Sequence, residues 1–487
     1  MKREPRRALP LAAKIAMSTA LGALAPLAHA ADKDVLIHKL ESQNEAMAKT
    51  MAAMQQQMQA MQKQLQALQQ QAGTIATQQQ AQETQVQQTV QTQQQIKADV
   101  AAVQQDAQQS ARQLGATTAK ADALSKFSLW GYGEVYYARP TKRASQTTLD
   151  LARGVFGIGY QFDENTRFNS EFEVEHGVAS ASDPGEVEVE QLYVEHRFHE
   201  GLSGRAGVFL IPAGLTNENH EPTNFYGVQR NFVETLIIPS TWREGGLSLL
   251  GSTQSGLDWN VGITTGVDLA KWNFSPETPM YNSALNLIAG DVAPLQATHQ
   301  EGAFANAQRM SGYLSLNYRG IPGLTLGGSF FGGQANPAQP TIGSQTVTLG
   351  ELHARWQPGK WDLSTVVAQG TISNTGAVNR LFPGTANPMP SRFNGAYVQA
   401  AYTIWQQGGS RLAPFARLER YNMGAAYEGL APGYTATPSG WAVPRDTVWT
   451  LGANFYLTPN VVLKADYQRF NTNTDFSRID LGLGVSF

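Results

Sequence analysis

The chain has 487 residues, of which 42% are hydrophobic, 46 are glycine and none is cysteine, and its formal net charge is −3. The absence of cysteine excludes disulfides, thiolate metal sites and cysteine nucleophiles, and it suits an oxidising compartment. After Lys126 the chain has 23 basic and 30 acidic residues. This balance predicts no nucleic-acid partner.

The first 30 residues have the pattern of a secretory signal peptide. Basic residues come first, an apolar run extends from Ile15 to Leu27, and Ala28-His29-Ala30 supplies a small-x-small cleavage pattern. The apolar run is shorter than the roughly 20 residues that a helix needs to span a bilayer. We therefore expect residues 1–30 to be removed rather than kept as an anchor.

Residues 31–126 form a second segment, which is rich in Gln and Ala and contains no Trp, Tyr, Phe or Pro. Apolar residues follow a heptad pattern from Ile37 and Leu40 to Leu114 and Leu124, which predicts an α-helical coiled coil. A lone amphipathic helix of this kind cannot bury its apolar seam, so the pattern predicts self-association, most simply as a homotrimer. The alternative is that the Gln-rich sequence only mimics heptads and forms no helix.

From Phe127 to Phe487 the pattern changes to short alternating strands. At the C-terminus apolar residues occupy every second position from Ile479 to Phe487, and polar residues or glycine lie between them. This alternation is typical of a transmembrane strand with one face toward lipid. Short connections alternate with long ones, and the strands between them number about 16. The predicted fold is an all-β transmembrane barrel of about 16 antiparallel strands, preceded by an α-helical coiled coil, in outer-membrane lipid.

A barrel of this size leaves a water-filled lumen, so function depends on the side chains that point inward. On the strand from Arg167 to Glu175, Arg167 and an acidic ladder of Glu171, Glu173 and Glu175 are predicted to face the lumen, opposite the apolar residues. Opposed charges on other strands are expected to line the same lumen and to select solutes by charge and size: Arg355, Arg417, Glu419, Lys464, Asp466, Arg478 and Asp480. The alternative is that these charged side chains only form ion pairs with one another on the solvated wall of the lumen.

The long connection from Pro212 to Glu244 is predicted to fold into the channel as a constriction. It interleaves aromatic and charged residues, an order that is unusual for a mobile outer loop. The candidate constriction residues are Arg230, Glu234, Arg243 and Glu244. Arginine donors suit oxyanions, but both glutamates lie beside them in the sequence.

The segment from Arg205 to Leu215, together with this long connection, resembles the phosphate-selective porin O and P family, and the resemblance covers most of the chain after Lys126. The resemblance implies a homotrimer of 16-stranded barrels that passes small anions such as phosphate through lumens lined by arginine and lysine. This barrel departs from that pattern because it has only four lysines: Lys142, Lys271, Lys360 and Lys464. The terminal Phe487 resembles the signal that the barrel assembly machinery recognises.

These features together predict a passive outer-membrane porin with a periplasmic stalk. Both ends of the barrel are expected on the periplasmic side, because bacterial barrels have short periplasmic turns. Histidines such as His176 and His220 lie in no recognisable nucleophile motif, so we expect no catalytic residue, no metal and no cofactor. The alternative function is mechanical, with residues 31–126 tethering the membrane to peptidoglycan.

Overall fold

The computed structural model describes residues 110, 124–179, 185–275, 281–282, 287–288, 292–434 and 443–487. The predicted signal peptide and almost all of the predicted coiled coil therefore lie outside the described residues. Residues Phe127–Phe487 belong to one compact unit. Within the described ranges, no helix is both long and apolar enough to cross a bilayer.

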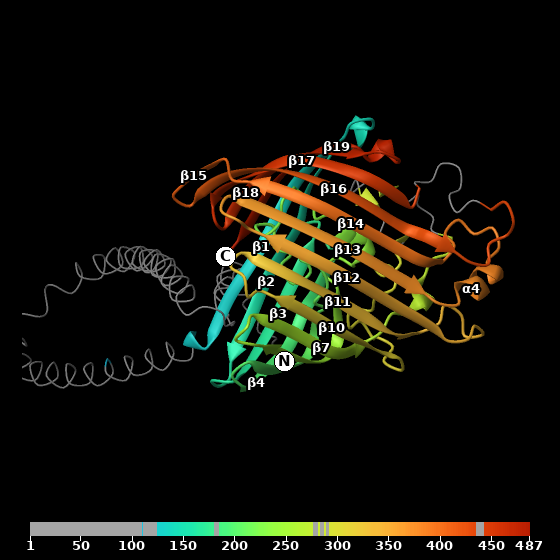
Figure 1. The fold of residues 1–487 in the computed structure, drawn as a ribbon, viewed down its shortest axis with the longest axis horizontal. Helices are drawn as coiled ribbons and strands as arrows, with labels where there is room; N and C mark the ends of the chain where they lie inside the picture. Colours follow the sequence, from blue (N-terminus) through green and yellow to red (C-terminus); the bar gives the residue numbers. More distant parts are fainter. Residues whose placement is uncertain are drawn as a thin grey trace, which may run out of the picture. The chain divides into compact units, whose positions relative to one another are not determined.

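Antiparallel strands form one closed sheet around the interior (Figure 1). Its first part comprises β1 (Phe127–Pro140), β2 (Thr148–Gln161), β3 (Thr166–Glu175), β4 (Val187–His199), β5 (Leu202–Leu210), β6 (Arg243–Ser252) and β7 (Leu257–Thr265). Its second part comprises β10 (Met310–Tyr318), β11 (Leu324–Ala335), β12 (Gln345–Trp356), β13 (Trp361–Ile372), β14 (Pro390–Tyr402), β15 (Trp405–Gln407), β16 (Ser410–Tyr427), β17 (Arg445–Thr458), β18 (Val461–Phe470) and β19 (Arg478–Ser486). A separate pair is formed by β8 (Tyr281–Asn282) and β9 (Leu287–Ile288).

Strand pairing confirms the predicted barrel. Strand β7 pairs with β10, and β1 pairs with both β2 and β19, so the sheet has no edge. The sheet has 17 strands, but β14 and β15 pair in succession along the single strand β16 and count as one crossing. The barrel is thus a closed, antiparallel one of 16 crossings, which leaves no backbone edge unpaired.

The connections alternate in length as predicted. Short turns follow β2, β4, β6, β10, β12, β15 and β17, and longer connections follow β1, β3, β5, β7, β11, β13, β16 and β18. In the two-residue turn after β4, Gly201 has a φ of 80°, a conformation that suits glycine. The longer connections contain the short helices η1 (Ala144–Gln146), η2 (Val233–Ile237), η3 (Leu269–Lys271), α4 (Thr375–Leu381) and η5 (Thr474–Phe476).

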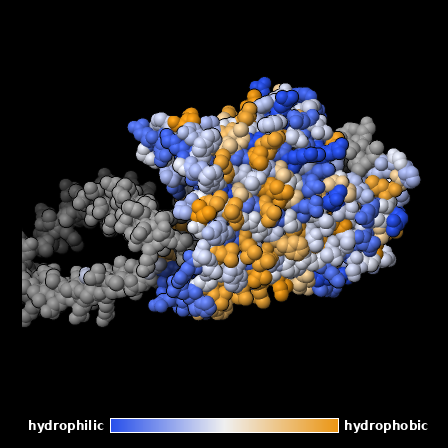
Figure 2. Space-filling model, viewed as in Figure 1, coloured by the Kyte–Doolittle hydropathy of each residue, from blue (hydrophilic) through white to orange (hydrophobic). Residues whose placement is uncertain are grey.

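The outer face of the barrel is apolar. In β19, Ile479, Leu481 and Leu483 are 40–49% exposed, whereas Arg478 and Asp480, on the other face of the strand, are buried inside the barrel. The same alternation along the other strands produces a hydrophobic band across the visible face, with hydrophilic residues gathered toward both ends (Figure 2). The strand side chains thus separate an apolar exterior from a polar and charged interior.

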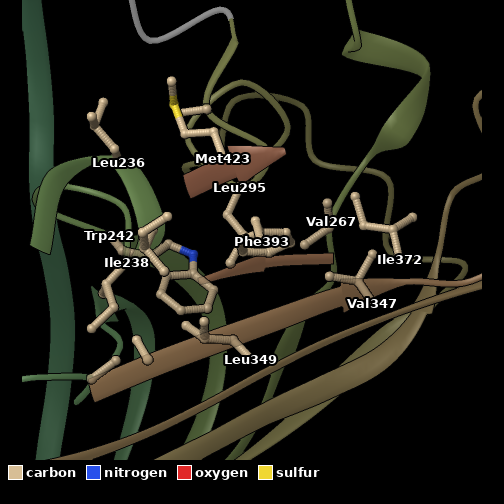
Figure 3. Packing of buried hydrophobic residues seen from close by; sticks show 14 of the residues in the cluster. Leu236, Ile238, Trp242, Val267, Leu295, Val347, Leu349, Ile372, Phe393 and Met423 are labelled. Carbon is tan, nitrogen blue, oxygen red and sulfur yellow. The ribbon is translucent and has the colours of Figure 1, made fainter. Parts of the chain in front are cut away.

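Part of the interior is filled by a hydrophobic core. The inward segment, which we define as residues 211–242 between β5 and β6, contributes Ile238 and Trp242 to this core. They pack with inward-facing Leu349 and Phe393 and with Leu295 from the connection between β7 and β10 (Figure 3). The inward segment therefore rests on the wall from β10 to β18 and leaves space beside β1 to β4.

Candidate functional site

A cavity of about 300 Å³ lies inside the barrel, between the walls of β1 to β4 and the inward segment. Its described lining includes six carboxylates, from Glu134, Glu173, Glu175, Glu186, Glu188 and Glu301. Three arginines, Arg153, Arg230 and Arg243, also line it. Acidic groups therefore outnumber basic groups two to one around this space.

The acidic wall arises from two neighbouring strands with the same alternation. Glutamate alternates with apolar residues from Glu171 to Glu175 and again from Glu186 to Glu190. Glu173 lies opposite Glu188 in the β3–β4 register, so carboxylates of both strands point inward side by side. Period-2 alternation on paired strands thus concentrates negative charge on one wall.

A β-bulge modifies this wall at Glu190. In the register of β3 and β4, Glu171 lies opposite Gln191 and Phe172 lies opposite Val189, so Glu190 is the extra residue. Bulges commonly redirect a side chain. Here the bulge leaves Glu190 fully buried within the barrel, and Gln191 next to it donates a hydrogen bond to Glu171.

Two arginines neutralise parts of the acidic wall. Arg153 lies within 2.9 to 3.3 Å of Glu134, Glu173 and Glu175. Arg243 forms ion pairs with Glu188 and, at 3.2 Å, with Glu301. Neither guanidinium faces the cavity without an adjacent carboxylate.

The predicted constriction residues divide into two kinds. Arg230 and Arg243 line the cavity, as just described, and Arg230 also donates to Thr241 Oγ1 at 2.8 Å within the inward segment. Glu234 and Glu244 are buried away from the cavity, and their carboxylates accept hydrogen bonds from backbone N–H groups. Glu234 accepts from the N–H of Thr216 at 2.8 Å, and Glu244 accepts from the N–H of Gln300 at 3.0 Å.

Tyr397 Oη donates to Glu234 at 2.9 Å, so a wall strand also fixes this part of the inward segment. A carboxylate that accepts several such hydrogen bonds holds a loop in one conformation. The inward segment therefore presents a defined surface to the cavity.

The charged residues predicted on β16 to β19 lie beneath the inward segment. Asp466 accepts the N–H of Val228 at 2.6 Å, and Arg417 donates to the carbonyl of Tyr226 at 3.1 Å. All six of these side chains are almost fully buried: Arg417, Glu419, Lys464, Asp466, Arg478 and Asp480. Arg417, Glu419 and Asp466 replace water as partners of the segment's backbone, and none of the six is among the residues that line the cavity.

The other predicted lumen residues form local pairs. Arg355 pairs with Asp362 at 2.7 Å, and Arg167 pairs with Glu195 at 2.5 Å. Glu171 accepts from Trp130 Nε1 at 2.6 Å. Glu173 and Glu175 line the cavity.

Several residues of this region are absent from the sequence-based candidates. Glu134 and Arg153 line the cavity, and His220 lies within 3.8 Å of Glu190. The alternation from Glu186 to Glu190 is a local signal that could have identified Glu188 and Glu190. His220 has no local signal, because its position depends on the course of the inward segment.

Two groups of side chains here have one ligand atom each within 4.8 Å of the others, close enough to hold a cation. They are Glu171, Glu190 and His220, and Glu173, Glu188 and Glu190. Burial lowers the pKa of His220, but the adjacent carboxylate of Glu190 outweighs this effect and raises it overall. Both groups share Glu190.

Comparison with known proteins places the chain in a family. It is 30% identical over 368 residues, 73% of this chain and 78% of the relative, to an uncharacterized protein of Aquifex aeolicus (strain VF5). The chain belongs to the family of this Aquifex protein. No family model matches the chain.

Solved barrels have a similar course of the backbone. One is Salmonella typhi OmpF in complex with daunomycin, at 13% identity and a TM-score of 0.46, covering 74% of this chain and 97% of that one. Another is an anion-selective porin from Comamonas acidovorans, at 13% identity and a TM-score of 0.42, covering 74% and 98%. Such distant similarity identifies no solute, so conclusions about selectivity depend on the charges of this cavity.

Proposed function

We propose that the chain is a porin of the bacterial outer membrane, a water-filled channel through which small hydrophilic solutes diffuse passively. The closed barrel and its apolar exterior support a membrane-spanning role, because a closed sheet satisfies its own backbone in lipid. The observation that carries the proposal is the charged cavity between the acidic wall and the inward segment. Passive diffusion requires no nucleophile and no cofactor.

The channel is proposed to prefer cations. Six carboxylates and three arginines of the described residues line the cavity, and a wall with excess negative charge raises the local concentration of cations. Phosphate would need donors that are not already paired with carboxylates, whereas two of the three arginines, Arg153 and Arg243, lie against glutamates. The charge pattern therefore favours cations over the phosphate that the family resemblance implied.

The proposed assembly is a homotrimer held by the heptad pattern of residues 31–126. The short turns and both barrel ends are proposed to face the periplasm, with Phe487 recognised by the barrel assembly machinery. A tether to peptidoglycan is compatible with a channel. Deleting residues 32–126 separates the two roles: a channel alone conducts unchanged, and a tether releases the envelope.

The test is the reversal potential of the purified mature protein in a planar bilayer under a KCl gradient, with EDTA present. The expected result is cation preference, with no block on addition of phosphate. Glu175→Gln and Glu188→Gln should each reduce that preference, whereas Glu200→Gln on an exposed turn should not. Anion preference with phosphate block would contradict the proposed selectivity, and absence of conductance would contradict the channel itself.

A further inference from the structure

A histidine and two glutamates converge beside the cavity from separate parts of the chain. Glu171 lies on β3, Glu190 lies on the bulge of β4, and His220 lies on the inward segment. One ligand atom from each lies within 4.8 Å of the other two. All three side chains are buried, so their charges have to be satisfied within the barrel.

The orientation of His220 is fixed from one side. Its Nδ1 lies 2.8 Å from the carbonyl oxygen of Asn217, and because a carbonyl only accepts, Nδ1 carries the proton. The other nitrogen, Nε2, faces Glu190 Oε2 at 3.8 Å, which is too long for a hydrogen bond. A backbone carbonyl on one imidazole nitrogen, with the other directed at carboxylates, is the usual support of a metal-ligating histidine.

Asn217 is itself held in place. Its Nδ2 donates to the carbonyls of Ile211 and Trp242 at 2.8 and 2.9 Å, and its Oδ1 accepts the N–H of Trp242 at 2.8 Å. The imidazole of His220 also lies edge-on to Tyr132, with ring centroids 5.5 Å apart. The histidine is therefore positioned before any ligand arrives.

The hydrogen-bond donors to the two carboxylates are neutral side chains, so the carboxylates keep their negative charge. Glu171 accepts from Trp130 and Gln191, and Glu190 Oε2 accepts from Tyr132 Oη at 3.1 Å. In the described structure Glu190 Oε1 has no hydrogen-bond partner, although Glu190 is 0% exposed. A buried carboxylate oxygen without a partner is costly, and a cation between these side chains would satisfy it.

We propose that Glu171, Glu190 and His220 bind a divalent transition-metal cation of the Zn²⁺ type. Imidazole together with carboxylates suits such ions, whereas Ca²⁺ and Mg²⁺ prefer oxygen ligands alone. The other group, Glu173, Glu188 and Glu190, is less suited to binding a cation. Two of its carboxylates already pair with arginines, Glu173 with Arg153 and Glu188 with Arg243. This site goes beyond passive diffusion, since the ion would join the inward segment to the acidic wall and stabilise the cavity.

The experiment is titration calorimetry of the mature protein in detergent at pH 8, after removal of metals with EDTA and of the EDTA by dialysis. Zn²⁺ is expected to bind at one site per chain and to raise the melting temperature of the protein. Glu190→Gln and His220→Gln should each weaken binding by about tenfold or more. The matched control is Glu351→Gln, because Glu351 and His353 form another buried carboxylate–imidazole pair at 2.9 Å.

Absorption of bound Co²⁺ provides a second measurement that does not depend on stability. His220→Gln should change this spectrum, and Glu351→Gln should leave it unchanged. The proposal is overturned if the native protein shows no saturable binding, which would mean that a proton alone satisfies Glu190. It is also overturned if Glu188→Gln abolishes binding while His220→Gln retains it, since the ion would then occupy the other group. Channel conductance in EDTA is independent of every one of these outcomes.

Discussion

The backbone N–H of Phe232 donates a hydrogen bond to Glu419 Oε2 at 2.6 Å, which joins the inward segment to the opposite wall of the barrel. The other oxygen of Glu419 accepts from Arg417 Nε at 2.9 Å. The ion pair is almost completely buried. A wall charge thus takes the place of water as the partner of a loop backbone, and the loop is fixed in the lumen by the wall that it covers.

Glu419→Gln should destabilise the barrel by about 3 kcal/mol, because the buried Arg417 guanidinium loses its carboxylate. Chemical denaturation followed by tryptophan fluorescence measures the change. The control is Asp258→Asn, which breaks the exposed pair with Arg319 and should cost under about 1 kcal/mol. An equal decrease in the free energy of unfolding in both variants would show that burial does not strengthen the Arg417–Glu419 ion pair.

Trp242→Ala should lower stability by about 3 to 5 kcal/mol, because it opens a cavity in the core under the inward segment. Trp242 is fully buried and lies edge-on to Phe331, with centroids 4.5 Å apart. Thermal melting by circular dichroism checks this expectation. Phe304→Ala is the control, since the Phe304 side chain is fully exposed, and a similar loss there would contradict the packing argument.

Arg243→Gln should increase cation preference, because Glu188 and Glu301 lose their shared counter-charge. One charge about 8 Å from a permeating ion in water contributes roughly 0.5 kcal/mol, with opposite signs for a cation and an anion, so the ratio of K⁺ to Cl⁻ permeability should rise about fivefold. The reversal potential under a KCl gradient measures the ratio. Arg319→Gln, at an exposed turn, should leave it unchanged; an unchanged ratio for Arg243→Gln would place that arginine outside the permeation path.

His299 should make the barrel less stable in acid. Burial lowers the pKa of His299 to about 4, and the nearby charge of Glu301 offsets only part of this effect. The unfolded chain, with an ordinary histidine pKa near 6.5, therefore takes up the proton first as the pH falls. The contribution of neutral His299 to the free energy of unfolding is fully present above about pH 6.5. It declines as the pH falls toward 4, by ~3 kcal/mol in total.

His299→Gln should remove this part of the pH dependence. The difference in melting temperature between pH 7.5 and pH 4.5 measures it in the native and variant proteins. His199→Gln is the control, because His199 is exposed at the end of β4. An unchanged difference in His299→Gln would mean that other groups dominate the acid response.

The sequence by itself determined the barrel, the number of its crossings and the alternation of short and long connections. These features are local: side-chain alternation in strands such as β19 identifies the outer face, and turn residues such as Gly201 mark where strands end. The unusual composition of residues 212–244 also indicated a segment inside the lumen. Those residues do lie in the barrel, with Trp242 in its core.

Only the tertiary structure decided which inward charges meet the cavity. Glu173 and Glu419 have the same local pattern, a glutamate between apolar or polar neighbours on a strand, but the inward segment covers Glu419 and leaves Glu173 beside the cavity. Likewise the bulge at Glu190 and the course of the inward segment bring His220 to a carboxylate 30 residues away. Alternation sets the face on which a side chain lies, whereas long-range packing sets what covers that face.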